Sequence, residues 1–468
     1  MKLYKLFLFI ISISAAVVAT AGNAAPVTLI VDTARPAQEI LGFGASGAWW
    51  AQVIGGWPEA QRRAIIRLLY DKQTGLGLSI YRYNIGADTL SDTAITNTEY
   101  RAESLLDTKT GRYDWSRDAN ARRVMREAIE AGASEVILFA NSPPVSMTKN
   151  GRGYGDKQPD DKKASNLAPE RYADFAAYLG EVTEHLLHVD KMPVVALSPI
   201  NEPEWDWAKP KQEGCYNTAA ESAAILRAAY DEIKRRALPV RIEGPEGGSW
   251  ESVIPYFEKI TNDAELRAGM KDLCVHSYWT TTPQKQKLRV WIDANRPDIR
   301  LHMSEWCDIP DGLGTGMDGA LPLARTAIED FTLGRVNTWQ YWRAASPYNL
   351  RGLVFYDTKT LQFAPSKRYW VFKQFTRYLE KGSVVLALKS SDKDAPAMAA
   401  RLPDGRVAVI CANLSVNAKT LDIKFSGNES WRQQLRVFTD DRNSNRESFA
   451  SDVLPPHSVV TMIFQKQP

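Results

Sequence analysis

Two glutamates in this sequence follow short apolar segments and could together cleave a glycosidic bond. Glu202 comes directly after the apolar segment 194–200 and Asn201, and Glu305 ends the segment 300–305. Glycoside hydrolysis needs one protonated carboxyl group that donates to the leaving oxygen and one ionised carboxylate that attacks the sugar or activates water. The amide of Asn201 could bond a sugar 2-hydroxyl, a contact that strengthens in the transition state. We therefore predict that Glu202 and Glu305 are the catalytic pair.

Further polar and aromatic side chains end other strand-like segments and could bind a substrate. Arg82 could keep a catalytic carboxylate ionised by lowering its pKa, and Tyr278 could donate a hydrogen bond to Glu305. Structural roles compete with this interpretation: a salt bridge for Arg82, core packing for His276 and Trp50, and loop support for Glu246. The predicted substrate-binding residues are Trp50, Arg82, Asn141, Asn201, Glu246, His276, Tyr278 and Trp342.

Strand-like and helix-like segments alternate between about residues 40 and 345. Eight short apolar segments, many of them ending in polar residues or glycine, read as buried parallel strands: 41–44, 78–85, 135–141, 194–200, 240–244, 273–278, 300–304 and 336–341. Helical periodicity separates them, as in 58–70, 115–132, 169–189, 219–236 and 321–334. The pattern predicts an α/β fold, a (β/α)8 TIM barrel over 40–365, whose active site forms at the carboxyl ends of the strands. A doubly wound open sheet is the alternative, although no G-x-G-x-x-G follows the first segment.

The pattern changes after the helix-like segment 366–380. Six short strand-like segments then follow at roughly ten-residue spacing, separated by turn-forming residues, and together they predict an antiparallel β-sandwich domain. Segment 27–31 also alternates like a strand. We therefore expect this second domain to combine residues 26–36 with residues 380–466, packed rigidly on the barrel.

Composition and charge exclude several classes of protein. The 468 residues carry 58 Lys+Arg and 55 Asp+Glu, a net charge of +3, which offers no basic surface for nucleic acid. Residues 1–24 combine a basic start, an apolar run and small residues, as in a secretory signal peptide, with an uncleaved anchor as the alternative. No later segment is apolar enough to enter a membrane stably. We expect a secreted or periplasmic protein, monomeric, with a polysaccharide or oligosaccharide as its partner.

Neither a metal nor a cofactor is expected. The four cysteines have no zinc-motif spacing, and His185 and His188 lack an acidic partner set. The 14 tryptophans are the unusual feature of the composition. Eight of them lie at or just after predicted strand ends, where they could line a sugar-binding cleft: Trp49, Trp50, Trp205, Trp207, Trp279, Trp306, Trp339 and Trp342.

The motifs Asn201-Glu202-Pro203 and Ser304-Glu305-Trp306 resemble those of a large clan of retaining glycosidases, and within it the sequence is similar to glycoside hydrolase family 30. The resemblance covers essentially the whole mature chain. It implies the (β/α)8 barrel with a β-sandwich built from both chain termini. It also implies that Glu202 is the acid/base, Glu305 the nucleophile and Arg82 the arginine of the second strand.

A narrower resemblance is to the endo-β-1,6-galactanase branch, which cuts the β-1,6-galactan side chains of arabinogalactan. The motifs that carry it are Gly42-Phe43-Gly44-Ala45-Ser46-Gly47-Ala48-Trp49-Trp50-Ala51-Gln52, Tyr113-Asp114-Trp115-Ser116-Arg117-Asp118, Asn141-Ser142-Pro143-Pro144 with Met147-Thr148, and Gln212-Glu213-Gly214-Cys215. Family 30 also contains xylanases and β-1,6-glucanases, which remain alternative activities. The alternative outside the enzymes is a carbohydrate-binding protein that has lost catalysis.

Two further expectations follow from the predicted enzyme. A retaining mechanism requires the two carboxyl groups to lie about 5–5.5 Å apart, whereas about 8 Å would imply inversion. Cys215 and Cys307 each lie beyond a catalytic glutamate, so an exported enzyme could join their loops by a disulfide across the cleft.

Overall fold

The computed structural model describes residues 25–155, 163–308, 314, 316–347, 351–447 and 452–468; the predicted signal peptide lies outside them. Eight strands close into a parallel barrel in the order β10-β11-β2-β3-β6-β7-β8-β9. Their bounds are β2 Gly42–Ser46, β3 Ile80–Ile85, β6 Glu135–Ala140, β7 Val194–Ser198, β8 Arg241–Gly247, β9 Asp272–His276, β10 Arg300–Trp306 and β11 Thr338–Tyr341. Every predicted barrel strand is present, which confirms the TIM barrel and excludes an open sheet.

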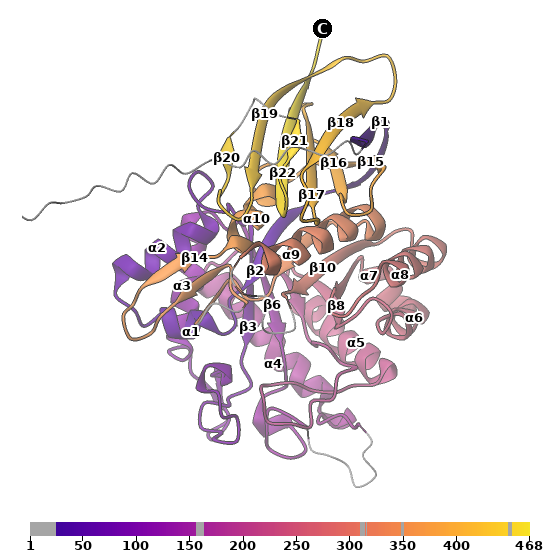
Figure 1. Cartoon of the computed structure of the whole chain (residues 1–468). Helices are drawn as coiled ribbons and strands as arrows, with labels where there is room; N and C mark the ends of the chain where they lie inside the picture. Colours follow the sequence, from indigo (N-terminus) through magenta and orange to yellow (C-terminus); the bar gives the residue numbers. More distant parts are fainter. Residues whose placement is uncertain (1–24, 156–162, 309–313, 315, 348–350, 448–451) are drawn as a thin grey trace, which may run out of the picture.

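Helices surround the barrel because each buries one apolar face against the strands (Figure 1). They are α1 Trp50–Ile54, α2 Glu59–Tyr70, α3 Ala119–Ala131, α4 Tyr172–Glu184, α5 Ala219–Arg235, α6 Ile254–Asn262, α7 Ala264–Gly269, α8 Thr282–Asn295, α9 Met317–Glu329 and α10 Lys367–Thr376. Local sequence fixes several ends: Thr218 and Glu221 form a capping box at the start of α5. Among the described residues, no helix is long and apolar enough to cross a membrane.

Small additional strands decorate the barrel. Strands β4 Leu106–Asp107 and β5 Arg112–Tyr113 form a hairpin, and β12 Ala345–Pro347, β13 Val354–Tyr356 and β14 Phe363–Pro365 form a three-stranded sheet. Both insertions follow barrel strands at their carboxyl ends, where loops build the active site of such a fold.

The second domain is one nine-stranded sheet in the order β20-β19-β22-β17-β16-β15-β1-β18-β21. Its strands are β1 Val27–Glu39, β15 Val384–Ser390, β16 Ala397–Arg401, β17 Val407–Asn413, β18 Lys419–Phe425, β19 Trp431–Thr439, β20 Arg446–Glu447, β21 Val453–Leu454 and β22 Ser458–Lys466. The N-terminal strand thus lies within the C-terminal sheet, and Figure 1 shows it in indigo beside the yellow and orange strands.

One detail of this sheet differs from the prediction of wholly antiparallel pairing. Strand β1 pairs antiparallel with β15 but parallel with β18. No hairpin joins β1 to β18, so their directions are not forced to oppose each other; β1 instead runs toward the barrel, which the chain enters at Gly42. The sheet curls, so that the ring of Phe425 in β18 meets that of Phe464 in β22, with centroids 5.2 Å apart.

The sheet domain rests on the barrel through α9 and α10 (Figure 1). Strand β17 is buried on both faces: Val409 packs inside the curled sheet, whereas Ile410 belongs to the core shared with the barrel. The hydroxyl of Thr461 in β22 donates to the carbonyl oxygen of Gln374 in α10 over 3.0 Å. This contact is buried, and the hydrophobic core at this interface includes residues of both domains.

Candidate active site

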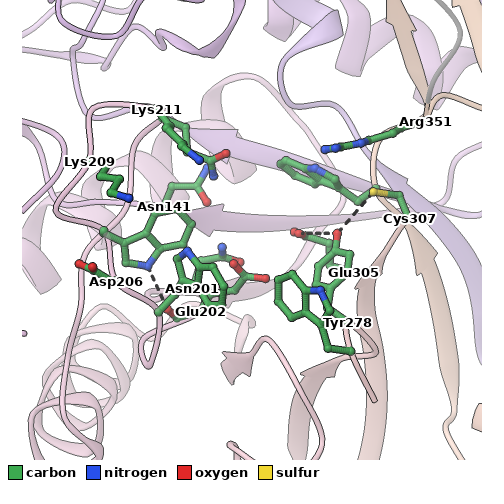
Figure 2. A pocket seen from close by; sticks show the side chains of 15 residues that line it. Asn141, Asn201, Glu202, Asp206, Lys209, Lys211, Tyr278, Glu305, Cys307 and Arg351 are labelled. Carbon is green, nitrogen blue, oxygen red and sulfur yellow. Dashed lines mark hydrogen bonds between the residues drawn. The ribbon is translucent and has the colours of Figure 1, made fainter. Parts of the chain in front are cut away.

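Glu202 and Glu305 lie on opposite sides of a cleft at the carboxyl ends of the barrel strands (Figure 2). Glu202 follows β7, and Glu305 lies near the end of β10. A carboxylate oxygen of one lies within 4.8 Å of a carboxylate oxygen of the other. The barrel therefore brings together two glutamates that are far apart in sequence. Their separation allows both carboxyl groups to contact the same glycosidic bond.

The cleft has a volume of about 370 Å³ and is lined by tryptophans and polar side chains. Of the predicted binding residues, Asn141, Asn201, Tyr278 and Trp342 line it. Trp205, Trp207 and Trp279 also line it, as the position of these tryptophans in the sequence predicts. The lining residues that were not predicted as binding residues are Asp206, Lys209, Lys211, Gln212, Cys307 and Arg351. Most of these lie on the loop after β7, where irregular sequence gives little indication of which side chains turn inward.

Glu305 is buried and held from two directions. The Arg82 guanidinium donates to one carboxylate oxygen at 2.6 Å, and the Tyr278 hydroxyl donates to the other at 3.1 Å. Arg82 also donates to Oδ1 of Asn201 at 3.2 Å and stacks over the ring of Phe139. Burial raises the pKa of Glu305, and the positive charges of His276 and Arg82 counteract this rise. The arrangement orients the carboxylate and compensates its charge inside the protein.

His276 connects Glu202 to a second, fully buried carboxylate. Its Nδ1 lies 3.0 Å from Oε1 of Glu202, and its Nε2 lies 3.2 Å from Oε2 of Glu246. Burial alone would lower the pKa of His276, but Glu305, Glu202 and Glu246 together raise it to about 10. At neutral pH the ring is thus an imidazolium that donates a proton to each neighbour.

Glu246 forms the base of this network. Burial raises the pKa of Glu246, but the charges of Arg82 and His276 outweigh it and bring the pKa to about 2. Its carboxylate lies 3.5 Å from Arg82 and accepts hydrogen bonds from His276 and the hydroxyl of Ser304. The role of Ser304 was not predicted, although its position directly before Glu305 was a signal.

Four predicted binding residues therefore need correction. Arg82, Glu246 and His276 are fully buried beneath the cleft, where they contact the two glutamates or each other and not the space open to a substrate. Trp50 belongs to the barrel core, and its indole nitrogen donates to the carbonyl oxygen of Ser46 at 2.8 Å. A helical turn begins at Trp50, and this turn directs its side chain to the helix side of the barrel.

The eight tryptophans at or just after strand ends divide into two groups. Trp205, Trp207, Trp279 and Trp342 line the cleft, as expected for a sugar-binding surface. Trp49, Trp50, Trp306 and Trp339 are buried in the hydrophobic core. Sequence position places a tryptophan near the strand end but does not determine on which side of the strand its ring packs.

The disulfide hypothesis is wrong. Cys215 and Cys307 are both free and buried. The thiol of Cys215 lies 4.0 Å from the side-chain oxygens of Ser165 and Asn217, whereas the thiol of Cys307 lies 3.9 Å from the hydroxyl of Tyr278. The two thiols thus have different neighbours and do not meet across the cleft.

Glu202, His276 and Glu305 also place potential metal-ligating atoms within reach of one another. The two ring nitrogens of His276 lie within hydrogen-bond distance of Glu202 and Glu246, so these contacts suit the cluster to holding and moving protons.

Comparison with known proteins agrees with this geometry. Residues 26–356 match O-glycosyl hydrolase family 30. The chain belongs to this family of glycoside hydrolases. It is 25% identical over 480 residues to an endo-β-1,6-galactanase from Hypocrea rufa, covering 94% of this chain and 96% of that protein.

Two solved structures share the complete fold. A conserved exported protein from Bacteroides fragilis superposes with a TM-score of 0.82 at 22% identity, covering 93% of this chain and all of that one. The catalytic domain of a GH30 xylanase C from Talaromyces cellulolyticus superposes with a TM-score of 0.74 at 19% identity, covering 94% and 100%. Both the barrel and the attached sheet are therefore part of the shared architecture.

Proposed function

We propose that this family 30 hydrolase is an endo-acting β-1,6-galactanase that retains the anomeric configuration, with Glu305 as nucleophile and Glu202 as acid/base. The observation that supports retention is the carboxylate pair, whose oxygens lie within 4.8 Å. Inverting enzymes need a wider gap of about 6.5–9.5 Å, because a water molecule must fit between the sugar and the base. The galactanase relative supports the choice of substrate.

The contacts of each glutamate match its proposed role in the first step. A carboxylate oxygen of Glu305 attacks the anomeric carbon while Tyr278 and Arg82 hold the carboxylate in place. The bond to the leaving oxygen breaks, and that oxygen takes the proton of Glu202. Because His276 occupies Oε1 of Glu202, the proton is carried on Oε2.

In the second step the roles of Glu202 reverse. Its carboxylate takes a proton from water, the water oxygen bonds to the anomeric carbon, and the ester bond to Glu305 breaks. Two inversions at one carbon return the original configuration. His276 stays protonated throughout and stabilises whichever carboxylate is charged.

Export supports the same substrate class, because plant galactan lies outside the cell. The basic and apolar pattern of residues 1–24 favours secretion or a periplasmic location, and one structural relative is an exported protein. We include this location in the proposal.

The decisive experiment gives the enzyme β-1,6-galactan, glucuronoxylan and β-1,6-glucan separately and identifies the oligosaccharides released. We expect short β-1,6-galacto-oligosaccharides, formed first as the β-anomer, and no release by Glu305→Ala with an unchanged circular dichroism spectrum. Release from xylan alone would favour the xylanase alternative, which the structural relative from Talaromyces cellulolyticus supports. Binding of galactan without products would favour a carbohydrate-binding protein.

A further inference from the structure

Two tryptophans beside the catalytic pair are more exposed to solvent than is usual for such large apolar side chains. Trp205 on the loop after β7 is 46% exposed, and Trp279 on the loop after β9 is 56% exposed. Their rings stack with centroids 5.0 Å apart and an interplanar angle of 7°. Both line the cleft. A large exposed aromatic surface surrounded by polar residues marks a binding site, because aromatic surface that stays in contact with water contributes little to the stability of the fold.

The backbone of Trp279 supports a functional origin for this pair. Its φ is 49°, in the left-handed region, which a bulky side chain rarely adopts. Such strain persists only when surrounding structure enforces it, and it concentrates at functional sites. In Trp279 the strained backbone presents the ring to Trp205 and to the cleft and not to the core.

Each tryptophan is linked to one catalytic glutamate. The backbone N–H of Trp205 donates to the carbonyl oxygen of Glu202 at 3.0 Å, and the indole of Trp207 donates to the same oxygen at 2.9 Å. Trp279 follows Tyr278 directly, and Tyr278 donates to Glu305. The stacked pair therefore has a fixed position relative to the bond that is cleaved.

We propose that Trp205 and Trp279 form a platform that stacks the galactose residue on the leaving-group side of the scissile bond. This proposal rests on the proposed galactanase function. Glu202 protonates the leaving oxygen, and Trp205 lies only three residues beyond it, so the departing sugar lies next to the pair. Asn201, Asn141 and Trp342 also line the cleft and are suited to the sugar that is attacked.

The chemistry of galactose fits such a platform. Its axial 4-hydroxyl leaves the hydrogens of C3, C4 and C5 together on the other face, which forms an apolar patch of ring size. Packing this patch on indole removes apolar surface from water on both partners. A platform for the leaving sugar favours cleavage within a chain, because a bond without a stacked sugar beyond it lacks this contact in the transition state.

The test compares two substrates that differ in the leaving group. The first is β-1,6-galactotetraose, and the second is β-1,6-galactobiosyl fluoride, whose fluoride leaving group cannot contact the platform. For Trp205→Ala and Trp279→Ala we expect kcat/KM on the tetraose to fall roughly 10- to 100-fold. On the fluoride we expect kcat/KM to stay within about twofold of wild type. Tyr113→Ala, an exposed aromatic outside the cleft, serves as the control and should change neither value.

The outcomes separate the two hypotheses. Equal losses on both substrates, or no loss on either, would overturn the platform. Trp279→Phe should recover part of the tetraose activity, because a smaller ring still stacks. If the wild-type enzyme releases nothing from the tetraose, the galactanase function itself is wrong; wild-type activity that survives both alanine substitutions refutes the platform alone.

Discussion

At the scale of single residues, the site shows how one side-chain type is given different properties by its neighbours. Glu246, Glu202 and Glu305 surround the same imidazolium, His276. Glu246 also faces Arg82 and is firmly ionised, with its pKa lowered to about 2. Glu202 lies at the edge of the cleft, where a proton can reach it. Glu246 thus differs from Glu202 and Glu305 in its position: it lies beneath the cleft beside two buried cations, whereas the other two carboxylates line the cleft.

The raised pKa of His276 predicts a pH dependence of stability. Its pKa is about 10 in the folded protein, against an unfolded value near 6.5. A group with a raised pKa stabilises the fold fully below the unfolded value and loses this contribution as pH rises toward the folded value. Urea unfolding should therefore show the free energy of unfolding falling between about pH 6.5 and 10, by an amount on the order of a few kcal/mol.

His276→Gln keeps a hydrogen-bonding side chain but removes the charge, so it should lower stability at pH 6 and flatten the curve above it. His457→Gln, at a partly exposed histidine of the sheet domain far from the site, is the matched control and should keep the decline of the wild-type curve between about pH 6.5 and 10. A wild-type slope that persists in His276→Gln would contradict the assignment of this proton.

At the scale of elements, strand alternation distributes chemistry and packing along one segment. In β3, Arg82 points into the barrel toward Glu305, while Tyr81 and Tyr83 join the core beneath the helices. The strands position only the residues within them.

The loops beyond the strands are held by separate contacts. Glu213, buried on the loop after β7, accepts hydrogen bonds from the backbone N–H of Ala87 at 3.0 Å and the hydroxyl of Thr89 at 2.7 Å.

This buried loop contact predicts a second pH effect. Burial raises the pKa of Glu213 to about 8, although its hydrogen bonds oppose the rise. Its contribution to stability is full below the unfolded pKa near 4.5 and declines as pH rises toward 8. Glu213→Gln retains both acceptor contacts without a charge, so its Tm should exceed that of wild type at pH 8.5 and match it at pH 4.5. Equal Tm differences at both pH values would contradict the prediction.

At the scale of the whole molecule, the sheet domain and the barrel share a hydrophobic core. Strand β1 belongs to the sheet and leads directly into β2 of the barrel, and β17 contributes side chains to the cores of both. The link through Thr461 and Gln374 is buried between them. A domain with such a shared core does not unfold alone, because its loss would expose the apolar faces of α9 and α10 to water.

We therefore predict a single unfolding transition. Calorimetry should give one peak, and intrinsic fluorescence and far-UV circular dichroism should change at the same temperature. Two separated peaks, or a chain lacking residues 380–468 that remains soluble and active, would show that the barrel is independent of the sheet.

The sequence by itself determined the architecture and the identity of the two central glutamates. Apolar segments such as 194–198 and 300–304 are buried on both faces in a parallel sheet, so their composition reveals them without knowledge of their partners. The carboxyl ends of such strands meet at one end of a barrel, and this rule brings Glu202 and Glu305 together from sequence order alone.

Only the tertiary structure decided what surrounds those glutamates. Side-chain directions depend on the neighbouring elements. They decide whether Trp50 or Trp342 faces the cleft and whether Cys215 meets Cys307. They also decide whether His276 contacts a substrate or Glu202. The parallel pairing of β1 with β18 likewise depends on a contact between the two ends of the chain. The local sequence pattern indicates the periodicity and burial of each strand. Contacts between distant residues depend on how the complete fold packs, and a local pattern holds no information about that packing.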